Sequence, residues 1–306
     1  MQVAEQEFDH LASLNAAQRQ AAEYGKEQDA GAFRAGPLLV IAGAGTGKTM
    51  TLAHRVAHLL LMGVSPERVL LLTFTRRAAQ EMTRRVENIV RASTRDANPL
   101  PSGGLPWSGT FHSIANRLLR RFARNLGLDP GFSVLDRGDA ADMLDVVRHE
   151  QKLTKTSRRF PKKDTCLAIY SRCVNTQKPL ADTLDQTYPW CSDWSDELGE
   201  LFRHYVLRKQ QNQSLDYDDL LLYWSHLVAE PEFAQEIGAW FDHVLVDEYQ
   251  DTNLVQAQIL NALKPSGDGL TVVGDDAQSI YSFRAAEVEN ILGFPDQYMP
   301  SARVIT

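Results

Sequence analysis

One stretch, Leu38–Thr49 (LLVIAGAGTGKT), constrains the fold of this chain most strongly. Four apolar residues precede a loop with three glycines, and Lys48, Thr49 and a helical pattern of apolar residues follow. Glycines let the backbone curl so that several N–H groups face one anion. The positive end of the following helix favours the same anion. The stretch therefore predicts a strand, a phosphate-binding loop and a helix.

The general phosphate-loop pattern G-x-x-x-x-G-K-[ST] is matched at every position but the first, where Ala42 stands. We predict that Lys48 reaches the β- and γ-phosphates of a nucleotide and that the Thr49 hydroxyl holds Mg²⁺. The alternative is a glycine-rich turn without a ligand, but packing alone does not explain Gly-Lys-Thr at the start of a helix. The predicted binding residues are Ala42, Gly43, Ala44, Gly45, Thr46, Gly47, Lys48 and Thr49.

Composition narrows the class of protein. A chain of 306 residues allows about two domains. No apolar run approaches about 18 residues, so no membrane association is expected, and the acidic, polar N-terminus does not resemble a signal peptide. The net charge of −7 argues against a uniformly basic nucleic-acid binder, but not against a local basic groove. Three cysteines without a C-x-x-C pair suggest a reducing cytoplasm.

Short apolar runs separated by helical patterns predict an open α/β fold, a parallel sheet flanked by helices. Residues 113–240 have helical periodicity and hardly any strand signal, so we interpret much of this region as a helical insertion. Ser214 is a candidate N-cap for the helix that follows it. The predicted strands are Leu38–Ile41, Val69–Thr73, Ser108–Thr110, Val244–Val246 and Leu270–Val273.

Two adjacent carboxylates follow the predicted strand Val244–Val246. Asp247 and Glu248 lie at its carboxyl end, where P-loop NTPases place an acidic residue that holds Mg²⁺. We predict that Asp247 binds the metal, directly or through water, and that Glu248 orients or deprotonates the attacking water. Adjacent Asp and Glu are common, but this position after an apolar strand and downstream of a phosphate loop is a more specific signal.

Other polar residues have both a structural and a functional interpretation. Asn15 is predicted to cap a helix through Gln18 and Ala22. His54 and His58 are interpreted as surface residues of the helix after the phosphate loop, because the glutamate of a zinc protease motif is missing. Two basic clusters are either solvated faces or contacts to nucleic-acid phosphates: Arg117, Arg120, Arg121 and Arg124 in the first, and Lys152, Lys155, Arg158, Arg159, Lys162 and Lys163 in the second.

Several segments resemble, in order, the motifs of superfamily 1A DNA helicases, the UvrD/Rep/PcrA family. Residues 247–253 (DEYQDTN) resemble motif II, and residues 274–286 (GDDAQSIYSFRAA) resemble motif III. Residues 73–79 with Met82 resemble motif Ia, and residues 109–113 (GTFHS) resemble the T-F-H motif. Leu14, Asn15 and Gln18 match the Q motif, and Ala42 matches the first phosphate-loop position of the family. The resemblance covers nearly the whole chain.

The resemblance implies a role for each matching position. Gln18 is implied to read the adenine edge of ATP, Gln278 to sense the γ-phosphate, and Arg284 to couple the nucleotide site to DNA. The implied catalytic residues are Lys48, Glu248, Gln278 and Arg284, with ATP and Mg²⁺ as cofactors. The bases of single-stranded DNA are implied to meet or stack on the aromatic side chains of Phe74, Tyr281 and Phe283, a contact that tolerates any base sequence. The backbone of the DNA is implied to contact Thr75, Thr110 and His112.

The resemblance also implies a domain organisation. We expect a RecA-like domain 1A at residues 1–120 and 214–306, interrupted by an all-helical domain 1B at residues 121–213. The basic clusters are expected to meet single-stranded DNA or its junctions with duplex DNA. The family continues into a second RecA-like domain, 2A, whose arginines complete the ATP site, and residues 303–306 are expected to begin the strand that leads there.

The expected function is that of the N-terminal half of an ATP-dependent 3′-to-5′ DNA helicase, weak or inactive as an ATPase by itself. Two alternatives stay open: the motor part of an AddA/RecB-type helicase–nuclease, and a DNA-binding module switched by nucleotide without unwinding. Three residues depart from the family pattern. Met50 stands where Arg is frequent, Arg76 where Asn is usual, and Ala285 where Gly is usual.

Overall fold

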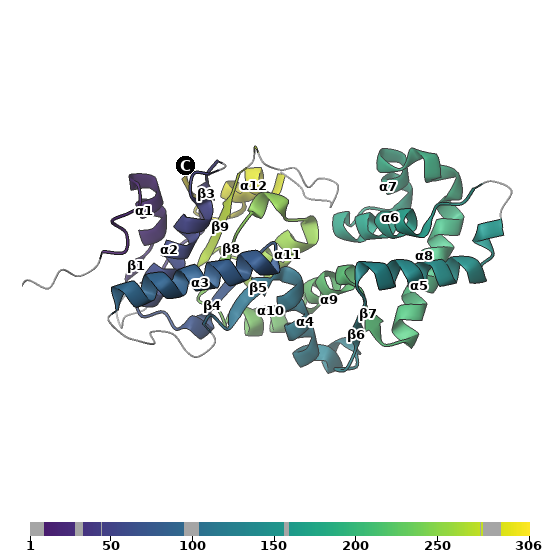
Figure 1. Ribbon diagram of the computed structural model, residues 1–306, viewed down its shortest axis with the longest axis horizontal. Coiled ribbons are helices and arrows are strands. Elements are labelled where there is room, and N and C mark those ends of the chain that lie inside the picture. The colour runs from purple at the N-terminus through teal and green to yellow at the C-terminus, as the bar shows by residue number, and fades with distance from the viewer. Residues whose placement is uncertain are drawn as a thin grey trace, which may run out of the picture.

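A parallel β-sheet forms the centre of the part of the molecule on the left of Figure 1. The computed structural model describes residues 9–27, 33–43, 45–94, 104–155, 159–275, 277 and 289–306. Within these ranges the sheet has six strands, all parallel to their neighbours. Their order is β10 (Arg303–Ile305), β3 (Leu38–Ile41), β9 (Leu270–Gly274), β8 (His243–Val246), β4 (Val69–Thr73) and β5 (Trp107–Thr110).

The predicted α/β fold with a parallel sheet is confirmed, and all five predicted strands are present. The sequence predicted five strands, one fewer than the six of the sheet in the described ranges. Arg303–Ile305 was expected only as the beginning of a strand leading to another domain, but it pairs here with β3, with Arg303 beside Leu38. Val304 is partly exposed on this edge strand.

Alternate side chains of each strand enter two separate cores, because successive residues of a strand face opposite sides of a sheet. Leu38, Val40, Val69 and Leu71 enter one core with Leu52 and Val56. This face is covered by α1 (Ala16–Glu23), α2 (Lys48–Leu61) and α3 (Arg76–Ser93). Leu39, Leu70, Leu72 and Val244 enter the other core. That face is covered by α4 (Phe111–Phe122), α9 (Tyr217–Ala229), α10 (Pro231–Gly238), α11 (Leu254–Leu263) and α12 (Glu289–Gly293).

A third core lies within a helical unit at the other end of the molecule's long axis (Figure 1). It is built from buried residues such as Leu144, Ile169, Leu201 and Tyr205. The unit comprises α5 (Arg137–Glu150), α6 (Lys163–Thr176), α7 (Leu180–Thr187) and α8 (Ser195–Gln211). No helix in the described ranges has the length and apolar character needed to cross a membrane.

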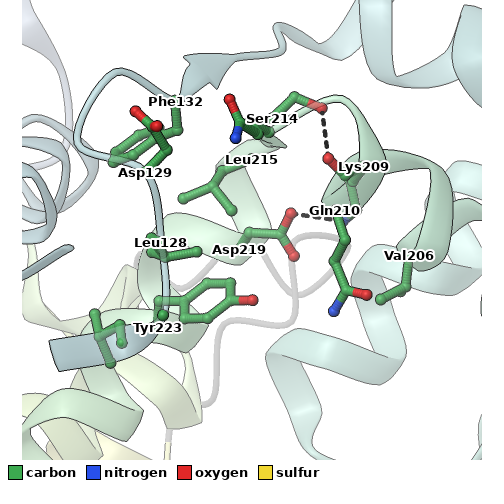
Figure 2. A pocket seen from close by; sticks show the side chains of 13 residues that line it. Leu128, Asp129, Phe132, Val206, Lys209, Gln210, Ser214, Leu215, Asp219 and Tyr223 are labelled. Carbon is green, nitrogen blue, oxygen red and sulfur yellow. Dashed lines mark hydrogen bonds and ion pairs between the residues drawn. The ribbon is translucent and has the colours of Figure 1, made fainter. Parts of the chain in front are cut away.

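A buried lysine joins the helical unit to the start of α9 (Figure 2). Lys209 Nζ lies 2.6 Å from Asp216 Oδ2 and 2.6 Å from Asp219 Oδ2, and it stands over the rings of Tyr170 and Tyr205. Lys209 and Asp219 line a cavity of about 360 Å³, which Tyr223 also lines. Burial and the neighbouring charge of Asp216 raise the pKa of Asp219 to about 6, although Lys209 acts in the opposite direction.

The predicted cap of α9 was wrong. Ser214 does not cap α9, because Ser214–Leu215 forms a short strand, β7, beside β6 (Ser133–Val134). The N-cap is Asp216, whose side chain accepts a hydrogen bond from the N–H of Asp219. Two further short strands, β1 (Lys26–Glu27) and β2 (Phe33–Arg34), pair antiparallel to each other.

The histidines of α2 lie inside the protein rather than on its surface. His54 and His58 are 6% and 9% exposed, and His10 stacks on both, with ring centroids 6.0 and 5.6 Å away. Burial lowers the pKa of all three. The prediction failed because α2 is covered on this side by the residues before α1, a contact that helical periodicity alone does not reveal. Among the described residues, no group of His, Cys, Asp and Glu has the arrangement of a metal site.

Candidate active site and adjoining cleft

The predicted phosphate loop connects β3 to α2, as expected. Gly47 is the N-cap of α2 and has a φ of 93°, in the left-handed region that glycine adopts without strain. The loop is closed by hydrogen bonds from Thr46 Oγ1 to the Gly43 carbonyl at 2.7 Å and from the Ala42 N–H to the Gly274 carbonyl at 3.0 Å. Gly45 also has a positive φ, whereas Ala44 lies outside the described residues.

Gln18 is placed beside this loop and also caps its own helix. Its Nε2 donates to the Thr46 carbonyl at 2.8 Å, and its Oε1 accepts from the Asn15 N–H at 2.9 Å. Asn15 completes a capping box at the start of α1, which confirms the predicted cap. Both ends of the Gln18 amide thus have partners within the protein. Its implied contact with adenine stays a prediction.

The two carboxylates lie at the end of β8 with different surroundings. Asp247 is 5% exposed, and its pKa is raised to about 6 by burial and by the charge of Glu248. Glu248 is half-buried and has a left-handed backbone, with a φ of 52°. Its Oε2 lies 3.3 Å from Lys48 Nζ, so the structure brings two predicted catalytic residues into contact. Thr49 is half-buried at the start of α2.

Gln250 belongs to this site and was missed as a functional residue. It lies in the short turn η6 (Tyr249–Asp251) and is 2% exposed. Its Nε2 donates to Glu248 Oε2 at 2.7 Å, and its Oε1 accepts from the Asp275 N–H at 3.0 Å. The sequence contained a signal, because Gln250 is a polar residue within the motif II segment, but nothing local revealed its contact with β9.

Several predicted residues cannot be placed. Five site candidates lie outside the described residues: Ala44, Gln278, Tyr281, Phe283 and Arg284. The same holds for Ala285 and for Arg158 of the second basic cluster. The roles implied for all of them stay predictions.

A cleft of about 780 Å³ opens where the carboxyl ends of β4 and β5 face the helical unit. Three predicted DNA-binding residues, Phe74, Thr110 and His112, line it on the sheet side. An adjoining cavity of about 470 Å³ shares Thr110 and His112 and adds Arg76. The helical unit contributes basic and aromatic side chains to the opposite wall: Arg137, Arg172 and Tyr188.

Tyr217 lines both cavities and was also missed by sequence reasoning. It is 41% exposed, and its ring meets that of His112 edge to face at 5.5 Å. The sequence signal that marks it is weak: an aromatic residue near the start of a predicted helix. The fourth predicted contact, Thr75, is exposed and does not line these two cavities; its hydroxyl caps α3 by accepting from the Ala78 N–H.

A network of buried polar groups ties this cleft to the loop after Glu248. Asn253 Nδ2 donates to Asn175 Oδ1 at 2.6 Å, and Asn175 Nδ2 donates to Asp218 Oδ1 at 2.7 Å. Ser171 Oγ also donates to Asp218 Oδ1, at 3.0 Å. Burial raises the pKa of Asp218 to about 6. The structure therefore connects motif II to α6 and to the start of α9.

The arginines of the first basic cluster are exposed, but three of them stand over aromatic rings. The guanidinium of Arg117 lies 3.8 Å from the ring centroid of Trp107, and Arg120 and Arg121 stand over Phe132 and Trp240. Arg120 also donates to the carbonyl oxygens of Pro130 and Phe132. These contacts favour a structural role for three of the four arginines.

A parallel sheet with a phosphate loop and paired carboxylates at its carboxyl edge defines the P-loop nucleotide-binding class. Within that class, a model of the UvrD/REP helicase N-terminal domain matches residues 23–299. The chain belongs to this family.

Curated relatives agree with the family match. The chain is 34% identical over 273 residues to the ATP-dependent DNA helicase PcrA of Staphylococcus epidermidis, covering 88% of this chain and 35% of that protein. It is 35% identical over 281 residues to PcrA of Bacillus subtilis, covering 91% of this chain and 36% of that protein. PcrA of Staphylococcus aureus is 36% identical over 273 residues. The chain thus spans about a third of the length of these relatives.

Proposed function

We propose that this chain is the ATP- and DNA-binding N-terminal part of an ATP-dependent DNA helicase that moves 3′ to 5′ on single-stranded DNA. The contact between Lys48 and Glu248 carries the proposal, because it brings a phosphate-loop cation and a carboxylate that can activate water to the same edge of the sheet. The cleft lined by Phe74, His112 and Tyr217 opens at the carboxyl ends of the neighbouring strands. Family membership and the names of the relatives agree with this function.

The residues present fit a nucleotide with Mg²⁺. Lys48 Nζ is buried and finds no hydrogen-bond acceptor among the described residues, so its ion pair with Glu248 leaves it able to bind phosphate oxygens. Asp247 is a buried carboxylate whose pKa is raised by burial and by the charge of Glu248, and a bound cation would favour its ionised form. Mg²⁺, when bound, neutralises charge on the β- and γ-phosphates. Asp247 and Thr49 are the proposed residues that would hold it.

In the proposed reaction, the loop backbone and Lys48 hold the phosphates, and the N-terminus of α2 adds its positive end. Glu248 is freed from Lys48 when that lysine turns to the phosphates. The carboxylate then orients the attacking water and accepts its proton. We propose that Gln18 reads adenine, which requires it to exchange its contact with Thr46, and that Gln278 and Arg284 sense the γ-phosphate and link it to DNA.

Single-stranded DNA is proposed to cross the cleft. Phe74 and Tyr217 offer aromatic faces for bases, while Thr110 and His112 lie near the path of the backbone. Thr75, Tyr281 and Phe283 are proposed to extend this path. Arg137 and Arg172 add positive charge from the helical unit, where phosphates of single-stranded DNA or of a junction would be attracted.

The domain boundaries stay part of the proposal: 1A at residues 1–120 and 214–306, and 1B at residues 121–213. The separate core of the helical unit supports an inserted domain. In proteins as long as the relatives, we propose that arginines from a second RecA-like domain, 2A, complete the ATP site. An arginine of this kind raises the rate of hydrolysis about 10³–10⁵-fold in related NTPases. This chain by itself is therefore expected to hydrolyse ATP slowly. The proposed location of the protein is the cytoplasm.

The test is ATP hydrolysis by the 306-residue chain with and without single-stranded DNA, beside Glu248→Gln. Detectable binding of MgATP, with slow hydrolysis that Glu248→Gln slows strongly, would support the proposal. Binding without any hydrolysis would favour the nucleotide-switched DNA-binding module instead. Fast, DNA-stimulated hydrolysis would contradict the need for a second domain. A nuclease domain in the complete gene product would favour the AddA/RecB-type alternative.

A further inference from the structure

Gln250 connects the ends of two neighbouring strands through one buried side chain. It donates to Glu248 Oε2 beyond β8 and accepts from the Asp275 N–H beyond β9. Both bonds have good lengths, 2.7 and 3.0 Å, and the residue is 2% exposed. A hydrogen bond to an ionised carboxylate is about twice as strong as one between neutral groups. This amide therefore restrains the Glu248 side chain from a rigid part of the sheet.

The space around Gln250 is shaped for it. A Cβ atom on Gly274 would lie 2.6 Å from Gln250 Oε1, closer than Cβ atoms approach other atoms, and 3.3 Å from the Gln250 backbone N, a tight contact. Glu248 itself has the left-handed backbone that L-residues rarely adopt, at a cost on the order of 1 kcal/mol. Such a conformation persists only where surrounding contacts hold it, and Gln250 supplies one of them, the hydrogen bond to the Glu248 side chain.

Lys48 and Gln250 both approach the same oxygen, Glu248 Oε2. Lys48 is also the residue that the proposed function assigns to the phosphates. Once Lys48 leaves, Gln250 is the remaining side-chain donor to Glu248 among the described residues. Its second bond, to the N–H of Asp275, prevents the amide from following the carboxylate.

We propose that Gln250 is a positioning residue, which holds the Glu248 carboxylate in place for the attacking water when Lys48 turns to the phosphates. The inference rests on the proposed function, because it assumes that Glu248 activates water. Gln250 acts through Glu248 and is not required for nucleotide binding. Its removal should therefore lower the rate of hydrolysis and leave the affinity for ATP unchanged.

The experiment is single-turnover hydrolysis of γ-³²P-labelled ATP with the chain in excess over ATP. This assay can follow very slow reactions, such as the rate of roughly 10⁻⁴ s⁻¹ of a P-loop GTPase that lacks its arginine. Gln250→Met has a similar length and loses both hydrogen bonds. Gln250→Glu still accepts from the Asp275 N–H but no longer donates to Glu248. We expect both to slow hydrolysis about 10- to 100-fold, with the dissociation constant for a fluorescent ATP analogue changed by less than about threefold.

A double-mutant cycle separates positioning from general damage. In a Glu248→Gln background, Gln250→Met should slow the residual hydrolysis by less than about twofold. An equal loss in both backgrounds, or no loss in either, would overturn the inference. Asn261→Leu is the control for a general loss of stability. It removes the hydrogen bond that Tyr298 Oη donates to Asn261 Oδ1, away from Glu248.

The result also tells the two proposals apart. If the unmodified chain hydrolyses ATP and Glu248→Gln slows hydrolysis strongly while Gln250→Met and Gln250→Glu are normal, only the role of Gln250 fails. If Glu248→Gln does not affect hydrolysis, the proposed function fails and the inference fails with it. Should Gln250→Met not fold, Gln250→Glu decides the question alone, because it retains the bond to Asp275.

Discussion

Asn253 donates a hydrogen bond to Asn175 at 2.6 Å and thereby joins the loop that carries Asp247 and Glu248 to the helical unit. Both residues are 7% exposed. The opposite end of the Asn253 amide caps α11 by accepting from the Gln256 N–H at 2.9 Å. Because the two contacts use different atoms of one side chain, a single substitution separates them.

Asn253→Asp is expected to destabilise the chain by about 1–3 kcal/mol. The new carboxylate still caps α11, but it presents an oxygen to Asn175 Oδ1 where a donor stood. Urea unfolding at pH 7 measures the change. Asn15→Asp is the matched control, because Asn15 forms the same capping box on α1 and is exposed. Asn and Asp cap equally well, so equal effects at the two sites would contradict the prediction.

Acidification should destabilise the chain through His243. Burial lowers the pKa of this histidine from 6.5 to about 4, with a further effect of the Arg55 charge. The unfolded chain binds a proton below about pH 6.5, whereas the folded state does not until about pH 4. The free energy of unfolding therefore falls as the pH decreases through this window. The contribution of His243 to this fall is about 2 kcal/mol between pH 7 and pH 5.

The measurement compares unfolding at pH 7 and pH 5 for the unmodified chain and for His243→Asn. The raised pKa values of Asp218, Asp219 and Asp247 act in the opposite direction between about pH 4 and 6, so only the difference between variants isolates His243. His226→Asn, at an exposed position, should leave the pH dependence unchanged. An unchanged pH dependence in His243→Asn would refute the assignment.

Gly274→Ala should impair hydrolysis although it lies in a strand of the core. Its Cβ would lie 2.6 Å from Gln250 Oε1 and 2.7 Å from Ile291 Cδ1. We expect a loss of stability of about 1–3 kcal/mol from this overpacking, together with slower ATP hydrolysis because Gln250 must move. Gly199→Ala in α8 is the control, because its new methyl group meets only Leu180 at 3.9 Å. It should stabilise the chain slightly. Normal hydrolysis by Gly274→Ala would argue against a fixed position for Gln250.

Tyr217 is expected to contribute to the affinity for single-stranded DNA by stacking. Tyr217→Ala should weaken binding by about 1–3 kcal/mol, whereas Tyr217→Phe retains the ring and should bind almost normally. The salt dependence of binding should not change, because the side chain neutralises no phosphate. Fluorescence anisotropy with a labelled oligonucleotide at several salt concentrations tests both points. Equal losses in the two variants would point to the hydroxyl group instead.

Arg76 offers the complementary test. It lines the cavity beside Thr110 and His112, at a position where the family usually has Asn. If Arg76 contacts a phosphate, Arg76→Ala should remove one phosphate contact. The slope of the logarithm of the binding constant against the logarithm of the salt concentration should then decrease in magnitude by about 1. The loss should be similar for oligonucleotides of different sequence. A weakened affinity with an unchanged salt slope would contradict a phosphate contact.

The strands, the phosphate loop and the carboxylate pair could be predicted because each is a local pattern. Leu38–Ile41 and Val69–Thr73 are continuous apolar runs, as strands buried on both faces require. The glycines before Lys48 are needed for a backbone conformation that other residues adopt only with strain. Asn15 was predicted as a cap because Asn satisfies free N–H groups at the start of a helix within its own turn.

The failures share a different cause. His54 and His58 follow the polar face of α2, yet the segment around His10 covers them. Ser214 has the chemistry of a cap, but pairing with β6 places it in a strand. Each outcome depends on a residue distant in the chain.

The amino-acid sequence by itself determined the α/β class, the phosphate loop and the candidate carboxylates, because these follow from backbone conformation and burial within a few residues. Only the tertiary structure decided that Gln250 joins Glu248 to β9, that Asn175 meets Asn253, and that Tyr217 lies beside His112. The last two contacts join residues 78 and 105 positions apart, and the first depends on the register of two parallel strands. Local sequence patterns do not reveal contacts between residues so far apart in the chain, because these contacts depend on how the whole chain packs.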